Sequence, residues 1–322
     1  ESRGLGDVYK RQPMRPINLR PMRPDEWHAV ADLICVSTNY WYQAGGKPMI
    51  FPGGPDSTML FCEVYEALDP GCCLVAEEPA TGRLMGSCFY HPRPTHISLG
   101  IMNVHPNYFG RGVAGQLLRF ITDLADRENK PVRLVSSAMN LDSFSLYTRA
   151  GFIPRCAFQD MYIGVPERGL KHTTPLADRV RPATPADIPA MVALENDVSH
   201  ISREKDYRYF IDNKMGIWHA SVLEAVDGKL DGFLVSVQHP GSNMLGPGVM
   251  KTPEAAAALI LAELDHNRGR KPVFLVPVAC AALVQQLYAW GARNCEIHFC
   301  QVRGAFEPFN GIVMPTFMPE TG

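Results

Sequence analysis

The sequence predicts an α/β (α+β) fold built as two tandem units of strands and helices. Strand-like runs alternate with amphipathic segments along the first half. The second half repeats several short motifs of the first in the same order. The chain has 322 residues, of which 46% are hydrophobic and 20% are charged. This length and composition suit two globular domains, each with its own apolar core.

Apolar spacing places the elements of the first unit. A strand from Ile17 is followed by a helix beginning near Asp25, and residues 39–56 form a loop rich in glycine, proline and aromatics. A second helix covers 57–68, and strands follow at 72–77, 84–90 and 97–104. The next helix spans 112–128, with its apolar positions on one face: Val113, Leu117, Phe120, Ile121 and Leu124. A strand at 132–135, a short helix at 142–149 ended by Gly151, and a strand to Ile163 complete the unit.

The second unit is predicted from a linker and a weak repeat. Residues 166–179 carry proline, glycine and charge without periodicity, and we take them as the linker. The segments 19–25, 82–86, 91–92 and 146–147 recur at 180–187, 228–232, 239–240 and 287–288. Four matches in one order predict domains at 14–165 and 180–322. Residues 1–13 lack the apolar core of a secretion signal and resemble translated adapter sequence. We expect a non-native extension there and a native start at Met14.

Charge and composition also argue against several classes of partner. The formal charge of −2 gives no electrostatic reason to expect nucleic acid or an anionic membrane as a partner. No apolar run approaches the roughly 18 residues of a membrane span. The nine cysteines are scattered without a CxxC pair, which predicts free thiols, a cytoplasmic location and no metal site.

Two segments about thirty residues apart carry the chemistry, 104–114 and 140–152. In the first, Gly110 and Gly112 lead into the helix that follows. Backbone N–H groups at a helix start bind phosphate, and glycine lets them approach it closely. In the second, Asn140, Ser143 and Tyr147 precede Gly151-Phe152 on a short helix.

Together these segments resemble the acetyl-CoA site of the GCN5-related N-acetyltransferase (GNAT) superfamily. The resemblance is firm over 17–165 and looser beyond. It implies two tandem GNAT-like domains, each with a mixed central sheet flanked by helices, and a first domain that binds acetyl-CoA. The residues it assigns to acetyl-CoA binding are Met102, Val104, Asn107, Phe109, Gly110, Arg111, Gly112, Val113, Ala114, Asn140, Ser143 and Tyr147. Met102 and Val104 would pair with the pantetheine amides. Asn107 departs from the Gln or Arg of the family pattern.

A rival interpretation of the loop is a dinucleotide fingerprint, because residues 110–115 satisfy GxGxxG. Three features oppose it. About eighty residues of structure precede the motif, the turn after Val104 is long, and no acid lies about 20 residues further on.

Tyr147 is the predicted catalytic residue. When an amine attacks the thioester, CoA leaves as a thiolate, and a nearby hydroxyl can donate a proton to it. The general base stays open. The strand 97–104 carries no carboxylate, and Glu63, Glu66, His91 and His105 are candidates.

The predicted function is transfer of acetyl from acetyl-CoA to a primary amine of a small molecule, such as an amino acid, polyamine or aminosugar. A protein or peptide amine and a non-catalytic acyl-CoA sensor are the alternatives. Acceptor specificity is expected in 39–56, where three aromatics precede the glycine- and proline-rich loop. The second domain lacks the phosphate loop, and its residues 311–319 resemble the tail of degenerate C-terminal GNAT domains. We expect it to shape or cover the acceptor site, or to form a homodimer.

Overall fold

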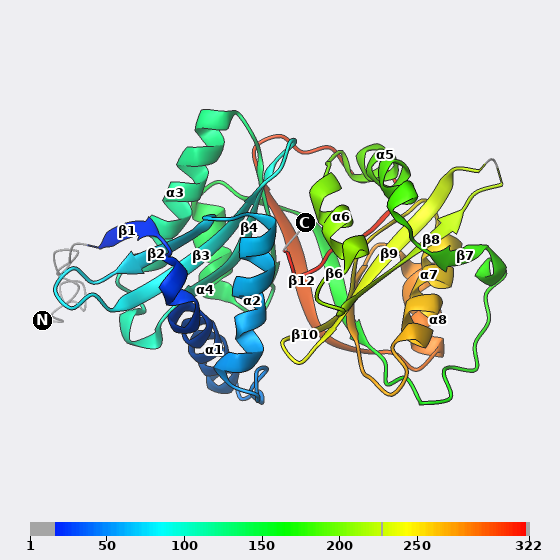
Figure 1. Ribbon diagram of the computed structural model, residues 1–322, viewed down its shortest axis with the longest axis horizontal. Coiled ribbons are helices and arrows are strands. Elements are labelled where there is room, and N and C mark those ends of the chain that lie inside the picture. Colours follow the sequence, from blue (N-terminus) through cyan, green and yellow to red (C-terminus); the bar gives the residue numbers. More distant parts are fainter. Residues whose placement is uncertain (1–16, 227, 320–322) are drawn as a thin grey trace, which may run out of the picture.

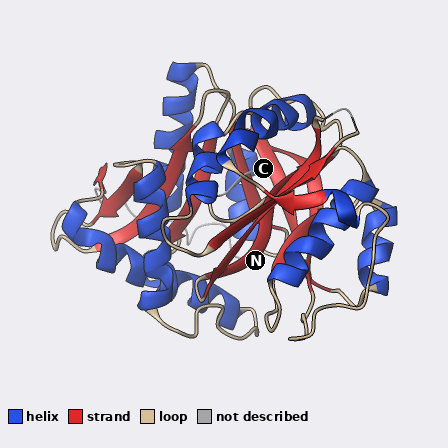
Figure 2. Cartoon of the chain, turned by 45° about the vertical axis from the view of Figure 1, so that its right-hand side comes forward, coloured by secondary structure: helices blue, strands red, loops and turns tan. Residues whose placement is uncertain are grey.

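The computed structural model describes residues 17–226 and 228–319, so the predicted extension lies outside the described residues. The chain forms a mixed 13-stranded sheet flanked by helices, which confirms the predicted fold class (Figures 1 and 2). The elements of the first half are β1 (Asn18–Pro21), α1 (Trp27–Ala44), α2 (Pro55–Leu68), β2 (Cys73–Glu77), β3 (Leu84–Pro92), β4 (Ile97–Val104), α3 (Val113–Glu128), β5 (Val132–Ser137), α4 (Leu141–Arg149) and β6 (Ile153–Tyr162). Among the described residues, no helix has the length and apolarity that crossing a membrane requires.

The second half repeats this order of elements, as the motif repeat predicts. Its elements are β7 (Val180–Pro182), α5 (Ile188–Ser199), α6 (Glu204–Asp212), β8 (Trp218–Glu224), β9 (Leu230–His239), β10 (Ser242–Met250), α7 (Pro253–His266), β11 (Val273–Pro277), α8 (Ala281–Ala289), β12 (Arg293–Arg303) and β13 (Ile312–Met314). The last strand, β13, has no counterpart in the first half.

The two halves exchange their long strands β6 and β12. The strand order is β1-β2-β3-β4-β5-β12-β6-β11-β10-β9-β8-β7. β12 therefore lies between β5 and β6, and β6 lies between β12 and β11. β6 and β12 pair antiparallel from Arg293 opposite Tyr162 to Val302 opposite Ile153, side by side at the centre of the molecule (Figure 1). The division predicted at 165 and 180 stays a prediction, but the sheet itself is continuous across it.

The two faces of the sheet are packed differently. On one face α1, α2, α5 and α6 share a single apolar core, which joins side chains such as Phe61 and Tyr65 to Phe233 and Trp218. On the other face the helices form two separate cores. One packs α3 and α4 on the first half, and the other packs α7 and α8 on the second. The first face therefore joins the two halves.

The predicted loop at 39–56 is wrong at its start, because α1 continues to Ala44. The run from Asn39 to Ala44 contains no glycine or proline, so nothing interrupts the helix until Gly45. The Gly45 N–H then bonds the carbonyls of Trp41 and Tyr42, both at 3.1 Å, and closes the last turn. The three aromatics are therefore helical residues, and the irregular connection is confined to 45–54.

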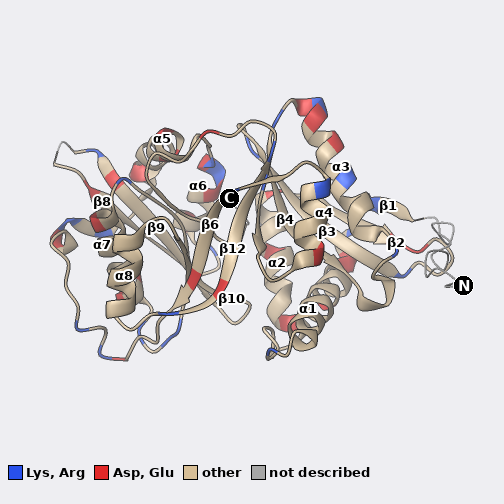
Figure 3. Ribbon diagram, turned by 180° about the vertical axis from the view of Figure 1, so that it is seen from behind, with Lys and Arg blue, Asp and Glu red and all other residues tan. Residues whose placement is uncertain are grey.

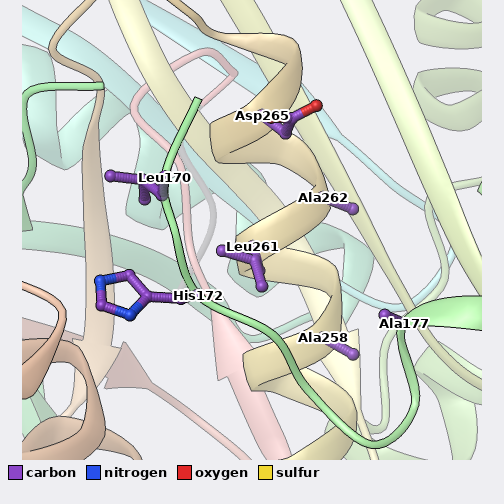
Figure 4. Close-up of a pocket in the computed structure, with 7 residues that line it drawn as sticks. All are labelled: Leu170, His172, Ala177, Ala258, Leu261, Ala262 and Asp265. Carbon is purple, nitrogen blue, oxygen red and sulfur yellow. The ribbon is translucent and has the colours of Figure 1, made fainter. Parts of the chain in front are cut away.

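The predicted linker is packed against the second half. The ring of His172 stacks on Trp290 with centroids 5.6 Å apart, and Arg179 forms an ion pair with Asp231. A cavity of about 210 Å³ lies between this segment and α7 (Figure 4). Its lining is Leu170, His172, Ala177, Ala258, Leu261, Ala262 and Asp265.

An arginine on the edge strand of each half fixes the first helix by the same ion pair. Arg20 donates two hydrogen bonds to Glu26, both at 2.7 Å, and Arg181 donates two to Asp187 at 2.7 and 2.9 Å. These bonds, more than any other contact, lower the pKa of Glu26 and of Asp187 to about 2. The repeat thus preserves a structural ion pair as well as an element order.

A second, buried ion network joins the halves. Arg93 at the end of β3 donates two hydrogen bonds to Asp206 of α6, at 2.7 and 3.0 Å, and two to Asp69 at 2.9 and 3.0 Å. His91 Nδ1 lies 2.7 Å from Asp69, and Lys205 of α6 also bonds Asp69. Arg93, Asp69 and Asp206 are all buried. Removing Asp206 would leave two donors of the buried Arg93 guanidinium without an acceptor.

Stability should fall on acidification as the two repeated acids protonate. A carboxyl group with a depressed folded pKa stabilises the protein fully above its unfolded pKa, about 4, and that contribution disappears as the pH falls through about 2. Urea unfolding of the wild type and of the Glu26→Gln/Asp187→Asn variant, measured from pH 5 to 2, should show a flatter pH dependence for the variant. Equal slopes would contradict the assignment.

Breaking the buried network should be costly. We expect Asp206→Ala to lower the free energy of unfolding by about 3–5 kcal/mol, because Arg93 stays buried with a partner removed. The control is Glu204→Ala on the same helix, whose exposed pair with Arg208 at 2.8 Å should be worth under about 1 kcal/mol. Urea denaturation of both variants measures the difference, and equal losses would refute the structural role of Arg93.

Candidate functional site

The site begins where two parallel strands separate. β4 and β5 are paired only at Ile97–Val132 and Ser98–Arg133, near their first residues. Beyond Ser98 no strand of the described chain pairs with this edge of β4, although β3 pairs with its other edge up to Val104. The result is an open wedge whose β4 side exposes unpaired backbone groups. Met102 and Val104 lie on this part of β4, where the predicted pantetheine pairing would need them.

A bulge in β4 accompanies the separation of the strands. The register with β3 shifts between Leu99 and Met102, so β4 has one residue more than its partner there. Gly100 sits in this bulge, and a Cβ on it would lie 2.9 Å from both His91 Nε2 and the Phe89 carbonyl oxygen. Glycine is therefore needed for the close approach of β3 and β4.

The loop after β4 leads unpaired amides to the start of α3. Gly110 and Gly112 have φ angles of +74° and +78°, and Gly112 is the N-cap of α3. Among the described residues, none accepts a hydrogen bond from the backbone N–H groups of Gly110, Gly112, Val113, Ala114 and Gly115. Such clustered N–H groups, with the positive end of a sixteen-residue helix dipole, suit a pyrophosphate.

Side chains of the same loop have mostly structural contacts. His105 Nδ1 accepts a hydrogen bond from the Asn107 N–H at 3.2 Å, and the guanidinium of Arg111 lies 5.1 Å from the centre of the Tyr108 ring. The exposed ring of Phe109 packs edge-on against Tyr40 of α1 at 5.7 Å. The loop is thus held to α1, on the opposite side of the wedge from α3.

The second motif lies on α4, directly after β5. Asn140 is the N-cap of α4, and its side-chain oxygen accepts from the Ser143 N–H at 3.0 Å. This leaves the Asn140 amide nitrogen to donate to a ligand. Tyr147 is 7% exposed and belongs to the same apolar cluster as Tyr108 and Val113 of the loop and α3. The structure therefore brings the two sequence motifs together beside the wedge.

The equivalent wedge of the second half is filled by the chain itself. β10 and β11 pair only at Met244–Val273 and Leu245–Phe274, and β13 then pairs with β10 from Gly248 to Met250. The loop corresponding to 105–112 is reduced to Lys251-Thr252, and α7 begins with Pro253, which lacks an N–H. The second half thus has neither the open edge nor the amide cluster.

The structure corrects one detail of the repeat. Tyr147 and Leu287 each accept a hydrogen bond from the residue after the terminal glycine, Phe152 N–H at 3.1 Å and Ala292 N–H at 3.0 Å. Tyr147 therefore corresponds to Leu287, and the sequence match to Tyr288 is displaced by one residue. The hydroxyl has no counterpart in the second half, and Cys280 stands at the N-cap position of Asn140.

Each of the four candidate bases is either exposed or held by contacts outside the wedge. Glu63 is exposed on α2, and Glu66 accepts from the Gly71 N–H at 2.9 Å. His91 belongs to the buried network with Asp69, and His105 caps its own loop. None of these contacts directs a base into the wedge.

A group that the sequence interpretation missed lies at the end of β5. Asp160 of β6 and Glu296 and His298 of β12 bring ligand-type atoms within 4.8 Å of one another. His298 Nδ1 lies 2.9 Å from Asp160, and Ser137, the last residue of β5, donates to Glu296. Burial raises the pKa of Asp160. Only the exchange of β6 and β12 brings Glu296 and His298 beside Asp160 and the end of β5, and no local motif signals it.

Positions of charged residues are interspersed along both halves of the ribbon (Figure 3). Acidic residues nevertheless mark β6 and β12 in the middle of the molecule, where Asp160 and Glu296 lie.

Comparison with known proteins agrees with this geometry. Residues 40–152 match the sequence profile of the Acetyltransferase (GNAT) family. This range contains α2, the wedge, the loop and α4. In the curated proteins, the UPF0157 protein YqkA of Bacillus subtilis strain 168 is 32% identical over 71 residues. The match covers 22% of this chain and 20% of that protein, so the chain corresponds to about a fifth of this relative.

Solved structures show the fold of the whole chain. A Pyrococcus horikoshii protein, provisionally assigned as an acetyltransferase, superposes with a TM-score of 0.73 at 15% identity, covering 97% of this chain and 98% of that one. A tandem GNAT protein from the clavulanic acid biosynthesis pathway superposes with a TM-score of 0.58 at 14% identity, covering 91% of this chain and all of that one. Residues 40–152 therefore carry the sequence signature of the GNAT family, and the chain as a whole has a fold similar to that of a tandem GNAT protein.

Proposed function

We propose that the protein is an acetyl-CoA-dependent N-acetyltransferase that moves an acetyl group directly to a primary amine of a small molecule. The observation that carries the proposal is the convergence of three features in the first half. These are the open β4 edge, the unpaired amides of Gly110 and of residues 112–115, and Tyr147 in the same apolar cluster as Val113. The GNAT family signature of residues 40–152 supports acetyl-CoA-dependent transfer in general.

Each feature has a distinct task in this proposal. The amide cluster binds the pyrophosphate, and the backbone of Met102 and Val104 pairs with the pantetheine. Asn140 donates a further hydrogen bond through its free amide nitrogen. Tyr147 donates a proton to the departing sulfur, whose thiol has an ordinary pKa near 8.5. No cysteine belongs to either motif, so the acetyl group passes to the amine without a covalent enzyme intermediate.

The second half has a supporting role in the proposal. Its own wedge is filled by β13, so one acetyl-CoA binds per chain. The tail beyond β13 returns to the first half, where the Tyr65 hydroxyl donates to the Phe317 carbonyl oxygen at 2.9 Å. All nine cysteines are free thiols, which supports a reducing, cytoplasmic location.

Tyr147→Phe should lower the rate of thiol release and spare binding. We expect kcat to fall by about a hundredfold or more, the usual contribution of a positioned proton donor, because the ring remains and the hydroxyl is lost. CoA should raise the melting temperature of wild type and variant equally. The assay is thiol release from acetyl-CoA with a panel of amines, lysine peptides included.

The control is Tyr288→Phe on the corresponding helix of the second half, whose hydroxyl donates to Gln159 at 2.8 Å. It should leave the rate unchanged. Equal activity of Tyr147→Phe and wild type would remove Tyr147 from the mechanism. CoA binding without release on any amine would favour the sensor alternative.

Gly110→Ala should weaken CoA binding beyond its effect on folding. A side chain at positive φ costs roughly 1–2 kcal/mol of stability and shifts the amides of the loop. Gly216→Ala is the matched control, since Gly216 also has a positive φ, +70°, with no atom near its missing Cβ, but lies between α6 and β8. Calorimetric titration with CoA should show a loss of affinity for the first variant alone. Equal affinities would contradict the amide cradle.

A further inference from the structure

The buried group at the end of β5 has an unusual balance of charge. Asp160, Glu296 and His298 are 3%, 7% and 7% exposed, and two of the three are carboxyl groups. Nδ1 of His298 is held by Asp160, and within the described residues nothing hydrogen-bonds its other ring nitrogen, Nε2. Carboxylates in the interior require a compensating cation or hydrogen bonds.

The group lies on the open side of the wedge, because α1 connects the two. Ser37 of α1 accepts a hydrogen bond at 2.6 Å from Asn103 on the unpaired part of β4. About one turn further along α1, the Tyr42 hydroxyl donates to Glu296 at 3.2 Å. Ser137, at the end of β5, bonds the same carboxylate. The C-terminal half of α1 therefore crosses the wedge from β4 to β12, and the buried group faces the gap on the side of the sheet away from α3 and α4.

The charged and titratable residues that contact this group or belong to it come from four elements. β6 contributes Asp160, β12 contributes Glu296 and Cys295, α1 contributes Tyr42, and the loop after it contributes Lys47. Lys47 is the only cation among these, with its Nζ 3.9 Å from Glu296. Phe317 of the tail covers the imidazole ring at 4.8 Å. Lys47 balances one of the two carboxylates, so one further positive charge would neutralise the group. A ligand with a second positive charge would be repelled by Lys47.

The exposed apolar side chains at the C-terminal end of α1 and beside it form what we call the rim. Tyr40 and Phe109, which pack together, are 49% and 48% exposed, and Met139, which contacts Lys47, is 50% exposed. Large apolar side chains left open at a mouth mark a surface that covers a ligand. The rim suits the apolar body of a ligand, and the acids beneath suit one cationic group.

We propose that Asp160, Glu296 and His298 form the acceptor site, which binds a monoamine carried on an apolar body. This rests on the proposed function. Glu296 binds the ammonium group, and Nε2 of His298 takes one of its protons, with Asp160 as the positioning residue. The nitrogen lone pair then forms the C–N bond at the thioester carbonyl as the C–S bond breaks. The sulfur takes a proton from Tyr147. The nitrogen loses its second proton to water, and water restores Tyr147 and His298.

The experiment measures amine binding and turnover separately. Phenethylamine is the probe, phenethyl alcohol its uncharged counterpart, and spermidine a polycation without an apolar body. With CoA present, phenethylamine should raise the melting temperature of the wild type, and the other two should not. In the thiol-release assay Glu296→Gln should raise KM for phenethylamine roughly ten- to a hundredfold. His298→Gln should lower kcat by about a hundredfold or more.

The matched control is His219→Gln. His219 Nδ1 lies 2.9 Å from Glu263 in a similar pair on β8 and α7, remote from the wedge. It should change stability without changing KM or kcat. Glu296-dependent binding of phenethylamine without any turnover would retain the acceptor site and reject the transferase. Three outcomes would overturn the site: unchanged kinetics in both variants, stronger binding of spermidine, or stabilisation by Mg²⁺ or Zn²⁺ through these residues with no response to phenethylamine.

Discussion

The antiparallel pairing of β6 with β12 is the interaction on which the rest of the structure depends. Each strand belongs by sequence to one half and completes the sheet of the other. The pairing makes the sheet continuous and allows α1, α2, α5 and α6 to share one core. The same pairing places Glu296 and His298 at the end of β5. A contact between residues far apart in the chain thus determines both the architecture and the chemistry of one site.

The two halves share a framework, but among the described residues only the first half has the open wedge and the amide cluster. Arg20 and Arg181 hold equivalent helices by equivalent ion pairs, so the scaffold is the same in both halves. The second half differs where acetyl-CoA would bind, with a short connection before α7, Leu287 in place of Tyr147, and β13 on the open edge of β10. Each change removes a different part of the binding surface. The described chain therefore contains two similar halves but one open wedge.

Local sequence features predicted most of the first half. Apolar periodicity located α2, β3, β4 and α3 to within a few residues, because each element packs against its own neighbours. The two motifs lie together beside the wedge, although their roles stay predictions. The end of α1 was mispredicted because the aromatics at 40–42 suggest a loop when read with the glycines that follow.

Long-range pairing could not be predicted in this way. The sequence of β12 does not indicate that it pairs with β5 and β6 and not with β11 of its own half. Strand register is set by the whole sheet. The acidic group at Asp160 and Glu296 was missed for the same reason. The displaced match of Tyr147 to Tyr288 shows that a weak repeat fixes element order more reliably than residue correspondence.

The strand exchange also has a consequence for the timing of folding during translation. β12 leaves the ribosome more than a hundred residues after β6, and until it arrives β5 and β6 each keep an unpaired edge, which can pair wrongly with other strands. At about 5–20 residues per second, the interval between synthesis of β6 and of β12 is on the order of ten seconds. A prematurely ended chain would carry the wedge and Tyr147 but lack Glu296 and His298. Only a chain synthesised through β12 can assemble this group, so the exchange delays its assembly until β12 has been made.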